Sequence, residues 1–413
     1  MRRIAAVAFL VWACLAGFGP EAAAQQPTRT LGVPPVKYNF APPGARSLAM
    51  GAAFIGLADD ATASESNPAG LTVLTRPELS AHFRYSEFDN EAPNTVTGSG
   101  FETFTSRVGS PSFFSVVYPW QNAAVSVYYQ RAADYRTASQ FSGLIEAPFD
   151  FYDVDTVSVL FRTENIGLSG AFKLGDKVSI GASIRGTRVV VQADQGAVLV
   201  ASLLDPFLLV GNFTTALDDS QSKTSFNAGI LFSPTSKFSI GGVYKRGASF
   251  DFTQTAETLF ETTVLPPDRT TTRQNVTLAV PDVFGGGLAI RPNDQFTIVA
   301  DVVQVQYSDA DPGPDAANFY QLFGEGGRQA LEDKTEFHAG LEYTFARGND
   351  WIFSVRGGYY FDPDHDGLAG LDSDQNHATF GGGVVVKNKL QVDVAANIAS
   401  AIKEGLISFV VRF

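Results

Sequence analysis

The stretch WIFSVRGGYYF, residues 351–361, alternates apolar and polar side chains with a period of two. One face is apolar and the other is small or charged: Trp351, Phe353, Val355, Tyr359 and Phe361 lie opposite Ser354, Arg356 and Gly358. Successive side chains of a β-strand point to opposite faces of a sheet, so this period indicates a strand. An apolar face backed by a charged face is expected where a strand separates lipid from a polar lumen.

The C-terminal stretch LISFVVRF (406–413) repeats this alternation and ends on an aromatic residue. A soluble β-sandwich would show a similar alternation, but it would not need an aromatic last residue. Chains that end in Phe after alternating apolar residues resemble substrates of the outer-membrane assembly machinery. The pattern therefore favours a membrane barrel over a sandwich.

Short turn segments recur along the chain, rich in the Gly, Pro, Asn and Asp residues that supply turn dihedrals. They are PWQN (119–122), LGDK (174–177), SPTSK (233–237), RPNDQ (291–295), ARGND (346–350) and VKNK (386–389). Longer polar segments alternate with them, at 89–110, 136–153, 193–220, 255–272, 309–332, 362–376 and, more briefly, 399–404. Short periplasmic turns and long external loops are typical of outer-membrane barrels. We therefore predict an all-β fold, a 14-stranded antiparallel transmembrane β-barrel over residues 77–413.

Composition narrows the function classes. The chain has 413 residues, a net charge of −13 and one cysteine, Cys14. Residues 1–24 combine a basic start, an apolar run and a small-residue end, which predicts a secretory signal peptide. The acidic balance argues against nucleic acid as a partner, because phosphate binding needs a basic surface. Beyond residue 24 no apolar run is long enough for a membrane-spanning helix, so a spanning form must be a closed barrel.

Residues 25–76 precede the first expected strand and are too long for a simple leader. A wide barrel can hold a plug in its lumen, so we expect an N-terminal extension and hatch there. Pro68 fixes a backbone angle and biases the preceding Asn67 away from helix, which suits the tip of a plug. The predicted hatch and gating residues are Asp59, Asp60, Asn67, Pro68, Ala69 and Gly70.

Two further expectations concern the side chains of this segment. The Asn67 amide is expected to cap or cross-link its turn. Asp59 and Asp60 are expected to bond to lumen cations such as Arg356 or Arg412. We expect the Asn-Pro-Ala turn to be the fixed point of the hatch and its flanks to move.

Several motifs resemble the FadL/TodX family, whose members transport long-chain fatty acids and hydrocarbons across the outer membrane. The hatch-like motifs are Gly44-Ala45-Arg46, Gly51–Gly56, Ala58-Asp59-Asp60-Ala61 and Asn67-Pro68-Ala69. The likeness continues in order through 227–252, 281–302, 354–364 and the region of Asp374. It implies a fourteen-stranded, hatch-plugged barrel in the outer membrane of a Gram-negative bacterium. It also implies capture of a hydrophobic ligand by external loops and release through hatch movement and a lateral opening.

The chain departs from the family pattern in two places. The family's lateral gap is associated with a kinked third strand, but residues 123–136 contain no Gly to indicate a kink. His377 stands where relatives often have Arg, which argues against the ion pair expected there.

The segment 193–220 is rich in leucine and contains Pro206. Its apolar residues could line one face of a short helix, or the segment could be a loop that packs on itself. A contiguous exposed apolar surface usually marks a binding site, so we predict an external groove for apolar cargo. Its proposed residues are Leu199, Leu203, Leu204, Phe207 and Leu208, with Leu259 and Phe260 as the opposite wall.

Alternation along their strands places Arg185 and Lys245 inside the lumen at similar height. Two such cations could hold a ligand carboxylate through charge-assisted hydrogen bonds. The alternative is that they pair with lumen acids such as Asp301 or Glu342. Because Arg356 and Glu342 face inward on neighbouring strands, we predict a structural ion pair between them.

The sequence predicts neither a metal site nor an enzyme. DPDHDG (362–367) opens like a calcium loop, but Ser373 stands where the final Glu ligand is needed, so we interpret it as an acidic external turn. The four histidines, His82, His338, His365 and His377, are scattered. No nucleophile elbow, zinc spacing or phosphate loop is present, and no cofactor is expected.

Two functions from different classes fit the sequence. The first is passive outer-membrane transport of a hydrophobic small molecule by a monomeric barrel in contact with outer-membrane lipid. The second is an interaction or assembly component, because some relatives with a similar N-terminal start serve as secretion-system shuttles.

Overall fold

The computed structural model describes residues 40–93, 101–145, 151–204, 207–262, 266–310, 331–364 and 374–413. The expected signal peptide, the extension before residue 40 and His365 lie outside these residues. Part of the calcium-like segment 362–367 also lies outside them. Within them, no helix is long and apolar enough to cross a membrane.

One antiparallel sheet contains every strand of the described chain. The first eight strands are β1 (Glu78–Pro93), β2 (Phe101–Pro119), β3 (Ala123–Ile145), β4 (Phe151–Leu174), β5 (Val178–Leu204), β6 (Phe207–Thr235), β7 (Phe238–Lys245) and β8 (Ala248–Thr262). The others are β9 (Asp268–Val280), β10 (Asp282–Ile290), β11 (Phe296–Gln306), β12 (Lys334–Arg347), β13 (Trp351–Asp362), β14 (Gln375–Val386), β15 (Leu390–Ile398) and β16 (Ile402–Arg412). A short 3-10 helix, η2 (Tyr307–Ala310), follows β11.

The barrel wall is a closed ring of fourteen strands, which confirms the predicted number. β8 continues β7 beyond a break at Arg246–Gly247, and β9 leads into β10 across Pro281. The ring closes because β1 pairs with β16 and β5 pairs with β6. Near the tight turns every strand is paired on both sides, so this part of the wall has no free sheet edge, which lipid would not tolerate.

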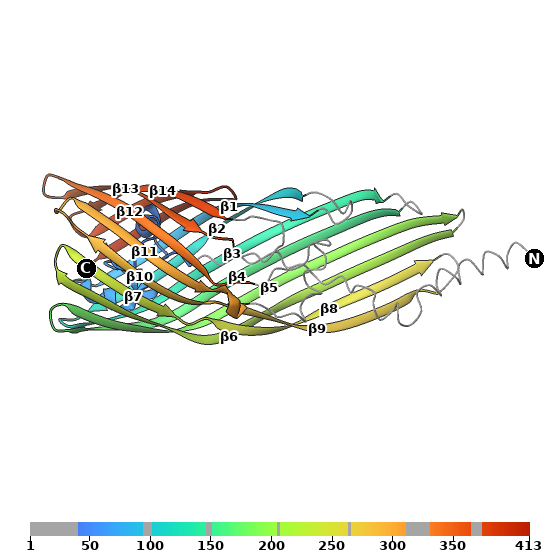
Figure 1. Cartoon of the computed structure of the whole chain (residues 1–413), viewed down its shortest axis with the longest axis horizontal. Helices are drawn as coiled ribbons and strands as arrows, with labels where there is room; N and C mark the ends of the chain where they lie inside the picture. Colours follow the sequence, from blue (N-terminus) through green and yellow to red (C-terminus); the bar gives the residue numbers. More distant parts are fainter. Residues whose placement is uncertain are drawn as a thin grey trace, which may run out of the picture.

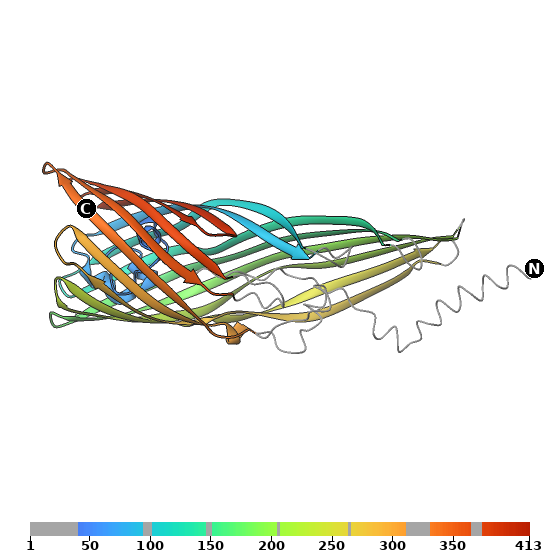
Figure 2. The ribbon, with the colours of Figure 1, turned by 45° about the horizontal axis from the view of Figure 1, so that its top comes forward.

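All six predicted short turns lie between consecutive strands of the ring. Figure 1 shows tight turns and the C-terminus at one end of the molecule, while β3, β4, β5, β6, β8 and β9 extend far beyond the other strands at the opposite end. Figure 2 shows the same extension from a second direction.

The extension corrects part of the sequence prediction. The segments 89–110, 136–153, 193–220 and 255–272 were expected to be external loops, but most of their described residues belong to strands β1 to β6, β8 and β9. A strand needs only about 9–11 residues to cross a bilayer, so a strand that continues into the external space looks like a loop in sequence. Both alternatives for 193–220, a short helix and a loop that packs on itself, are wrong for the described residues, because β5 and β6 pair there from Ala193–Leu217 to Leu204–Phe207. Cross-strand hydrogen bonds override the helical preference of leucine.

The alternation of side chains confirms the predicted orientation of the wall. Val355 is 59% exposed on the outside, whereas the next residue, Arg356, is 5% exposed inside. Aromatic side chains gather on the outer surface near the tight turns, where Tyr118 packs against Trp120 and Trp351 stacks on Phe353. Such belts mark the membrane–water interface of outer-membrane barrels.

Residues 40–76, the lumenal segment, lie inside the ring (Figure 1). They contain α3 (Ala45–Ala49), α4 (Ala63–Ser66) and the 3-10 helix η1 (Pro68–Val73). Elements this short gain little stability alone, because an isolated helix needs about 12–15 residues in water. Their order therefore comes from contacts with the wall.

Candidate functional site

Hydrogen bonds attach the lumenal segment to strands all around the barrel. Ala45 N donates to Ser408 Oγ of β16, and Phe54 N and Ile55 N donate to Asp301 Oδ2 of β11 at 2.6 and 2.8 Å. Other bonds have donors in the wall: Asn227 Nδ2 donates to Glu65 O, Ser169 Oγ to Ser64 O and Ser239 Oγ to Gly56 O. In the reverse direction, Ser64 Oγ of the segment donates to Ser126 Oγ of β3. The polar inner face of the wall thus satisfies the backbone groups that the short helices leave unpaired.

Asn67 joins three parts of the molecule, as the sequence indicated for its amide. Its Oδ1 accepts a hydrogen bond from Ala69 N and caps η1, while its Nδ2 donates to Ile55 O at 2.9 Å and to Ile230 O of β6 at 3.2 Å. The side chain is fully buried. The Asn-Pro-Ala turn is therefore tied both to the rest of the lumenal segment and to the wall.

Glycines in the wall allow this close approach. A Cβ on Gly229 would lie 2.1 Å from Asn67 Oδ1, and a Cβ on Gly241 would lie 2.1 Å from Ile55 O. Pro68 and Ala69 press in the same way against Gly181 of β5. Only a residue without a side chain fits at these positions.

Gly229→Ala is expected to loosen the Asn67 turn, because the new methyl group overlaps a buried oxygen. Chain residues after Cys14 include no cysteine, so Ser66→Cys, at a side chain that is 1% exposed, gives a single reporter thiol. Overpacking costs about 1–3 kcal/mol, so we expect roughly tenfold faster thiol labelling of the reporter. The control is Gly186→Ala, whose Cβ would meet nothing within 4 Å. Equal labelling rates in the two variants would contradict the prediction.

Arg46 lies at the centre of a half-buried ionic network. Its guanidinium donates to Glu342 through Nε (3.0 Å) and Nη2 (2.9 Å) and also bonds to Asp59. Arg291 Nη2 reaches the same Asp59 at 3.2 Å. Although burial alone would lower the pKa of Arg46, the carboxylates of Asp59 and Glu342 raise it well above its ordinary value.

The acids of the lumenal segment do not contact the cations that the sequence suggested. Arg356 pairs with Glu342 at 2.6 Å, as predicted, and with Asp393 at 2.7 Å, while Arg412 pairs with Glu78. Neighbouring wall acids thus neutralise both arginines.

Asp60 turns back to its own segment. It accepts hydrogen bonds from the backbone N and the hydroxyl of Thr62. Burial raises the pKa of the Asp60 carboxyl, although Arg46 and Thr62 act in the opposite direction. This acid therefore stabilises the fold of the lumenal segment rather than its attachment to the wall.

Arg185 and Lys245 both face the lumen, where each is 7% exposed. They converge on one carboxylate of the lumenal segment: Lys245 Nζ lies 2.8 Å and Arg185 Nη1 lies 3.7 Å from Glu65 Oε1. This differs from the alternative pairing with Asp301 or Glu342. Sequence reasoning missed Glu65, because no pattern in a short polar segment shows which acid will reach the wall.

A cavity of 40 Å³, the cationic cavity, lies directly against these three side chains. Arg185, Lys245 and Glu65 are the charged members of its described lining, so the cavity carries an excess of one positive charge. Its remaining lining has polar members such as Asn165 and apolar members such as Val280. An anion with an apolar body would match this lining.

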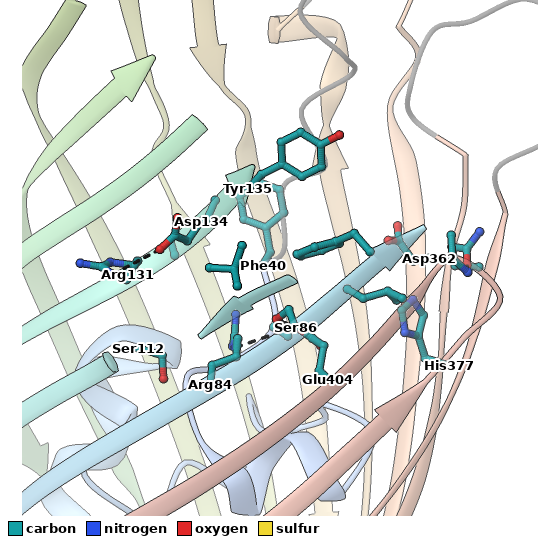
Figure 3. Close-up of a pocket in the computed structure, with 18 of the residues that line it drawn as sticks. Phe40, Arg84, Ser86, Ser112, Arg131, Asp134, Tyr135, Asp362, His377 and Glu404 are labelled. Atoms are coloured by element: carbon teal, nitrogen blue, oxygen red, sulfur yellow. Dashed lines mark hydrogen bonds and ion pairs between the residues drawn. The ribbon is translucent and has the colours of Figure 1, made fainter. Parts of the chain in front are cut away.

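A second cavity of 90 Å³, the seam cavity, adjoins the first, and Phe40, Ala132 and Ala133 line both. Figure 3 shows labelled side chains from β1, β2, β3, β13, β14 and β16 around it. Two histidines of its lining sandwich a buried tyrosine: His377 stacks on Tyr360 with ring centroids 3.9 Å apart, and His338 stacks at 5.2 Å. His377 Nδ1 also hydrogen-bonds to Asn397 Oδ1 at 3.0 Å, so its partner is an amide and not a charged group.

The wall loosens beside the seam cavity. β2 and β3 pair from Phe113–Gln130 to Pro119–Ala124, and no pairing is found between their outer halves in the described residues. Both strands are irregular at this point, with bulges near Ser112 and Ala132. A kink-like irregularity in the third strand is therefore present without glycine, because a bulge needs only one extra residue.

The residues expected to form an external groove occupy two pairs of extended strands. Leu199, Leu203, Leu204, Phe207 and Leu208 belong to β5 and β6, and the described residues do not include their side chains. Leu259 and Phe260 are half-buried in β8, opposite Asn212 and Gly211 of β6. Whether these residues hold cargo stays a prediction.

Comparisons with known proteins place this geometry among transporters. The family model described as outer membrane protein transport protein (OMPP1/FadL/TodX) matches residues 41–406. No curated protein matches the chain. A FadL homologue from Pseudomonas aeruginosa has a similar solved structure, with 12% identity, TM-score 0.64 and coverage of 92% of this chain and 99% of that one.

Two toluene transporters are also structurally similar. TodX from Pseudomonas putida shares 14% identity at TM-score 0.62, over 91% of this chain and 99% of that chain. TbuX from Ralstonia pickettii shares 17% identity at TM-score 0.60, again over 91% and 99%. At these identities the likeness supports the fold alone.

Proposed function

The chain belongs to the OMPP1/FadL/TodX family of outer membrane transport proteins, and we propose that it passes hydrophobic molecules through the membrane without an energy source. As a member of this family, it is an outer-membrane β-barrel of a Gram-negative bacterium. The lumenal segment then acts as the hatch that seals the lumen, and the two cavities that share Phe40 hold cargo above it.

The observation that carries the proposal is the composition of the cationic cavity. A channel for small hydrophilic solutes needs a water-filled lumen, but here the buried lumenal segment fills the lumen, and the cationic cavity has apolar lining residues such as Val280 and Val283 beside its polar ones. The excess positive charge beside Glu65 favours cargo with one negative group, such as a fatty acid. The extended β5, β6 and β8, with Leu259 and Phe260, are our candidates for the first capture of cargo.

Uptake of labelled oleate tests the transport function. We expect cells that carry the barrel to take up oleate faster than cells that lack it. If oleate entry does not depend on the barrel, fatty acid transport is excluded, and the interaction or assembly function becomes the better explanation.

Lys245→Ala tests the assignment of the head group site in the purified barrel. A hydrogen bond to a charged group contributes about 1.5–3 kcal/mol, so we expect oleate to bind roughly tenfold more weakly. Lys237→Ala is the matched control, because Lys237 lies exposed in the turn between β6 and β7. Unchanged oleate binding by Lys245→Ala would remove Lys245 from the site.

A further inference from the structure

The wall has another interruption, between β6 and β8. β6 pairs with β7 as far as Asn227–Lys245, and Arg246 N still bonds to Phe226 O at 2.8 Å. The pairing of β6 with β8 begins only at Ala216–Thr255. Between these points the described strands have no ladder bonds to each other. This interruption, the β6–β8 gap, runs over residues 217–225 and 248–254.

A hollow on each side of the wall meets at this gap. Outside lies a groove of 330 Å³, the outer groove, and inside lies the cationic cavity. Ser225, Gly247 and Ala248 line both. These three small residues therefore have the groove on one side and the cavity on the other, so the wall here is a single residue layer.

Side chains, not ladder bonds, hold the gap closed. Arg185 donates from Nε to Ser225 Oγ at 2.7 Å and from Nη2 to Arg246 O at 2.9 Å, which ties the two edges together at its lower end. Higher up, Gln221 Nε2 donates to Asp251 O. Side-chain bonds can break without unfolding a strand, so this part of the wall can open at lower cost than a paired one.

The chemistry of the outer groove suits an amphiphile in the outer leaflet. Ile184 (57% exposed) and Phe226 (41% exposed) present apolar surface, and Phe226 packs edge-to-face on Tyr244. Aromatic clusters of this kind lie at the membrane–water interface. The exposed Lys223 and Arg246 border the same groove and would attract an anionic head group.

The route to the cationic cavity from above is narrow. Phe161, Val189 and Phe250, from β4, β5 and β8, are completely buried in one apolar cluster. Ala248 and Val280 pack against this cluster and also line the cationic cavity. The cluster therefore covers the cavity on the external side, whereas the gap leads to it sideways.

We propose that the β6–β8 gap is a lateral port through which a monoanionic amphiphile of the outer leaflet reaches the cationic cavity. The proposal rests on the transport function, since the cavity must be a cargo site for the port to matter. Arg185 lies at the threshold, and a head group that bonds to it competes with Ser225 and Arg246 O, which opens the lower end of the gap.

Photo-crosslinking in membranes tests the port. The full-length barrel is reconstituted in phosphatidylcholine liposomes that contain a palmitate with a diazirine on its chain, and cross-linked residues are located by mass spectrometry. We expect cross-links at the outer groove and at the cationic cavity. Ala248→Trp fills the gap, and a steric cost of about 1–3 kcal/mol predicts roughly tenfold fewer cavity cross-links. Ala228→Trp, at an exposed position lower on β6, is the matched control and should leave the yield unchanged.

Gln221→Ala provides a second variant that does not depend on fitting a large side chain. It removes the bond to Asp251 O across the gap, so we expect more cavity cross-links than in the parent. Equal cavity yields in the parent, Ala248→Trp and Gln221→Ala would overturn the port. Oleate uptake by cells that carry the barrel separates the port proposal from the transport function. Uptake that depends on the barrel without cavity cross-links contradicts the port alone, and uptake independent of the barrel contradicts the transport function.

Discussion

A barrel without residues 25–76 is expected to assemble normally and to conduct ions. The ring of fourteen strands pairs without any contribution from the lumenal segment, so its hydrogen bonds remain after the deletion. Wall groups that now bind the segment, such as Asp301 and Asn227, would face water in the emptied lumen and stay solvated. Water-filled barrels of this type act as channels, so we expect conductance in planar bilayers to rise roughly tenfold or more.

The control for this deletion is assembly. The shortened chain should keep the β-sheet signal in circular dichroism and the heat-modifiable migration of a folded barrel. Conductance unchanged from that of the full-length protein in an assembled barrel would mean that the lumenal segment is not the seal. Loss of assembly would contradict the expectation that the wall folds without it.

The sequence was sufficient for the wall because the wall obeys local rules. Alternation predicted that Arg356 faces inward beside Glu342, and the two lie opposite each other in the β12–β13 pairing. The six tight turns contain Gly, Pro, Asn and Asp residues, which favour turn dihedrals. The strand ends at the tight-turn end of the barrel could therefore be located from the sequence. Strand length was harder to predict from the sequence, because two neighbouring strands can stay hydrogen-bonded to each other beyond the membrane.

The contacts of the lumenal segment were not predictable in the same way. Asp59 reaches Arg46 and Arg291, and Glu65 reaches Lys245, because the segment sits at a particular depth and rotation in the lumen. That placement depends on wall glycines such as Gly229, where the segment comes too close for any side chain. In the sequence these residues look like ordinary strand glycines. Three-dimensional fit, rather than a motif, selects the ionic partners.

A disulfide that locks α4 to the wall is expected to abolish cargo uptake. Ser64 Oγ and Ser126 Oγ are 2.7 Å apart, so Ser64→Cys with Ser126→Cys places two thiols near disulfide distance. Glu65, the next residue, is the carboxylate beneath the cationic cavity. We expect cargo to displace the Glu65 carboxylate from Lys245 by moving α4, which carries Glu65. A covalent bond at residue 64 would prevent that movement of α4. Oleate uptake should fall to the level of cells without the barrel when the bond forms, and recover after reduction.

A second lock tests which part of the hatch moves. Thr72 Oγ1 and Ser179 Oγ are also 2.7 Å apart, so Thr72→Cys with Ser179→Cys ties η1 to β5 with the same chemistry. Asn67 already anchors this turn to the wall, and we expect it to remain fixed during transport. The η1 lock should therefore leave oleate uptake unchanged under oxidising conditions. Equal inhibition by both locks would mean that the hatch moves as one body, whereas uptake through an oxidised α4 lock would show that cargo passes without displacing Glu65.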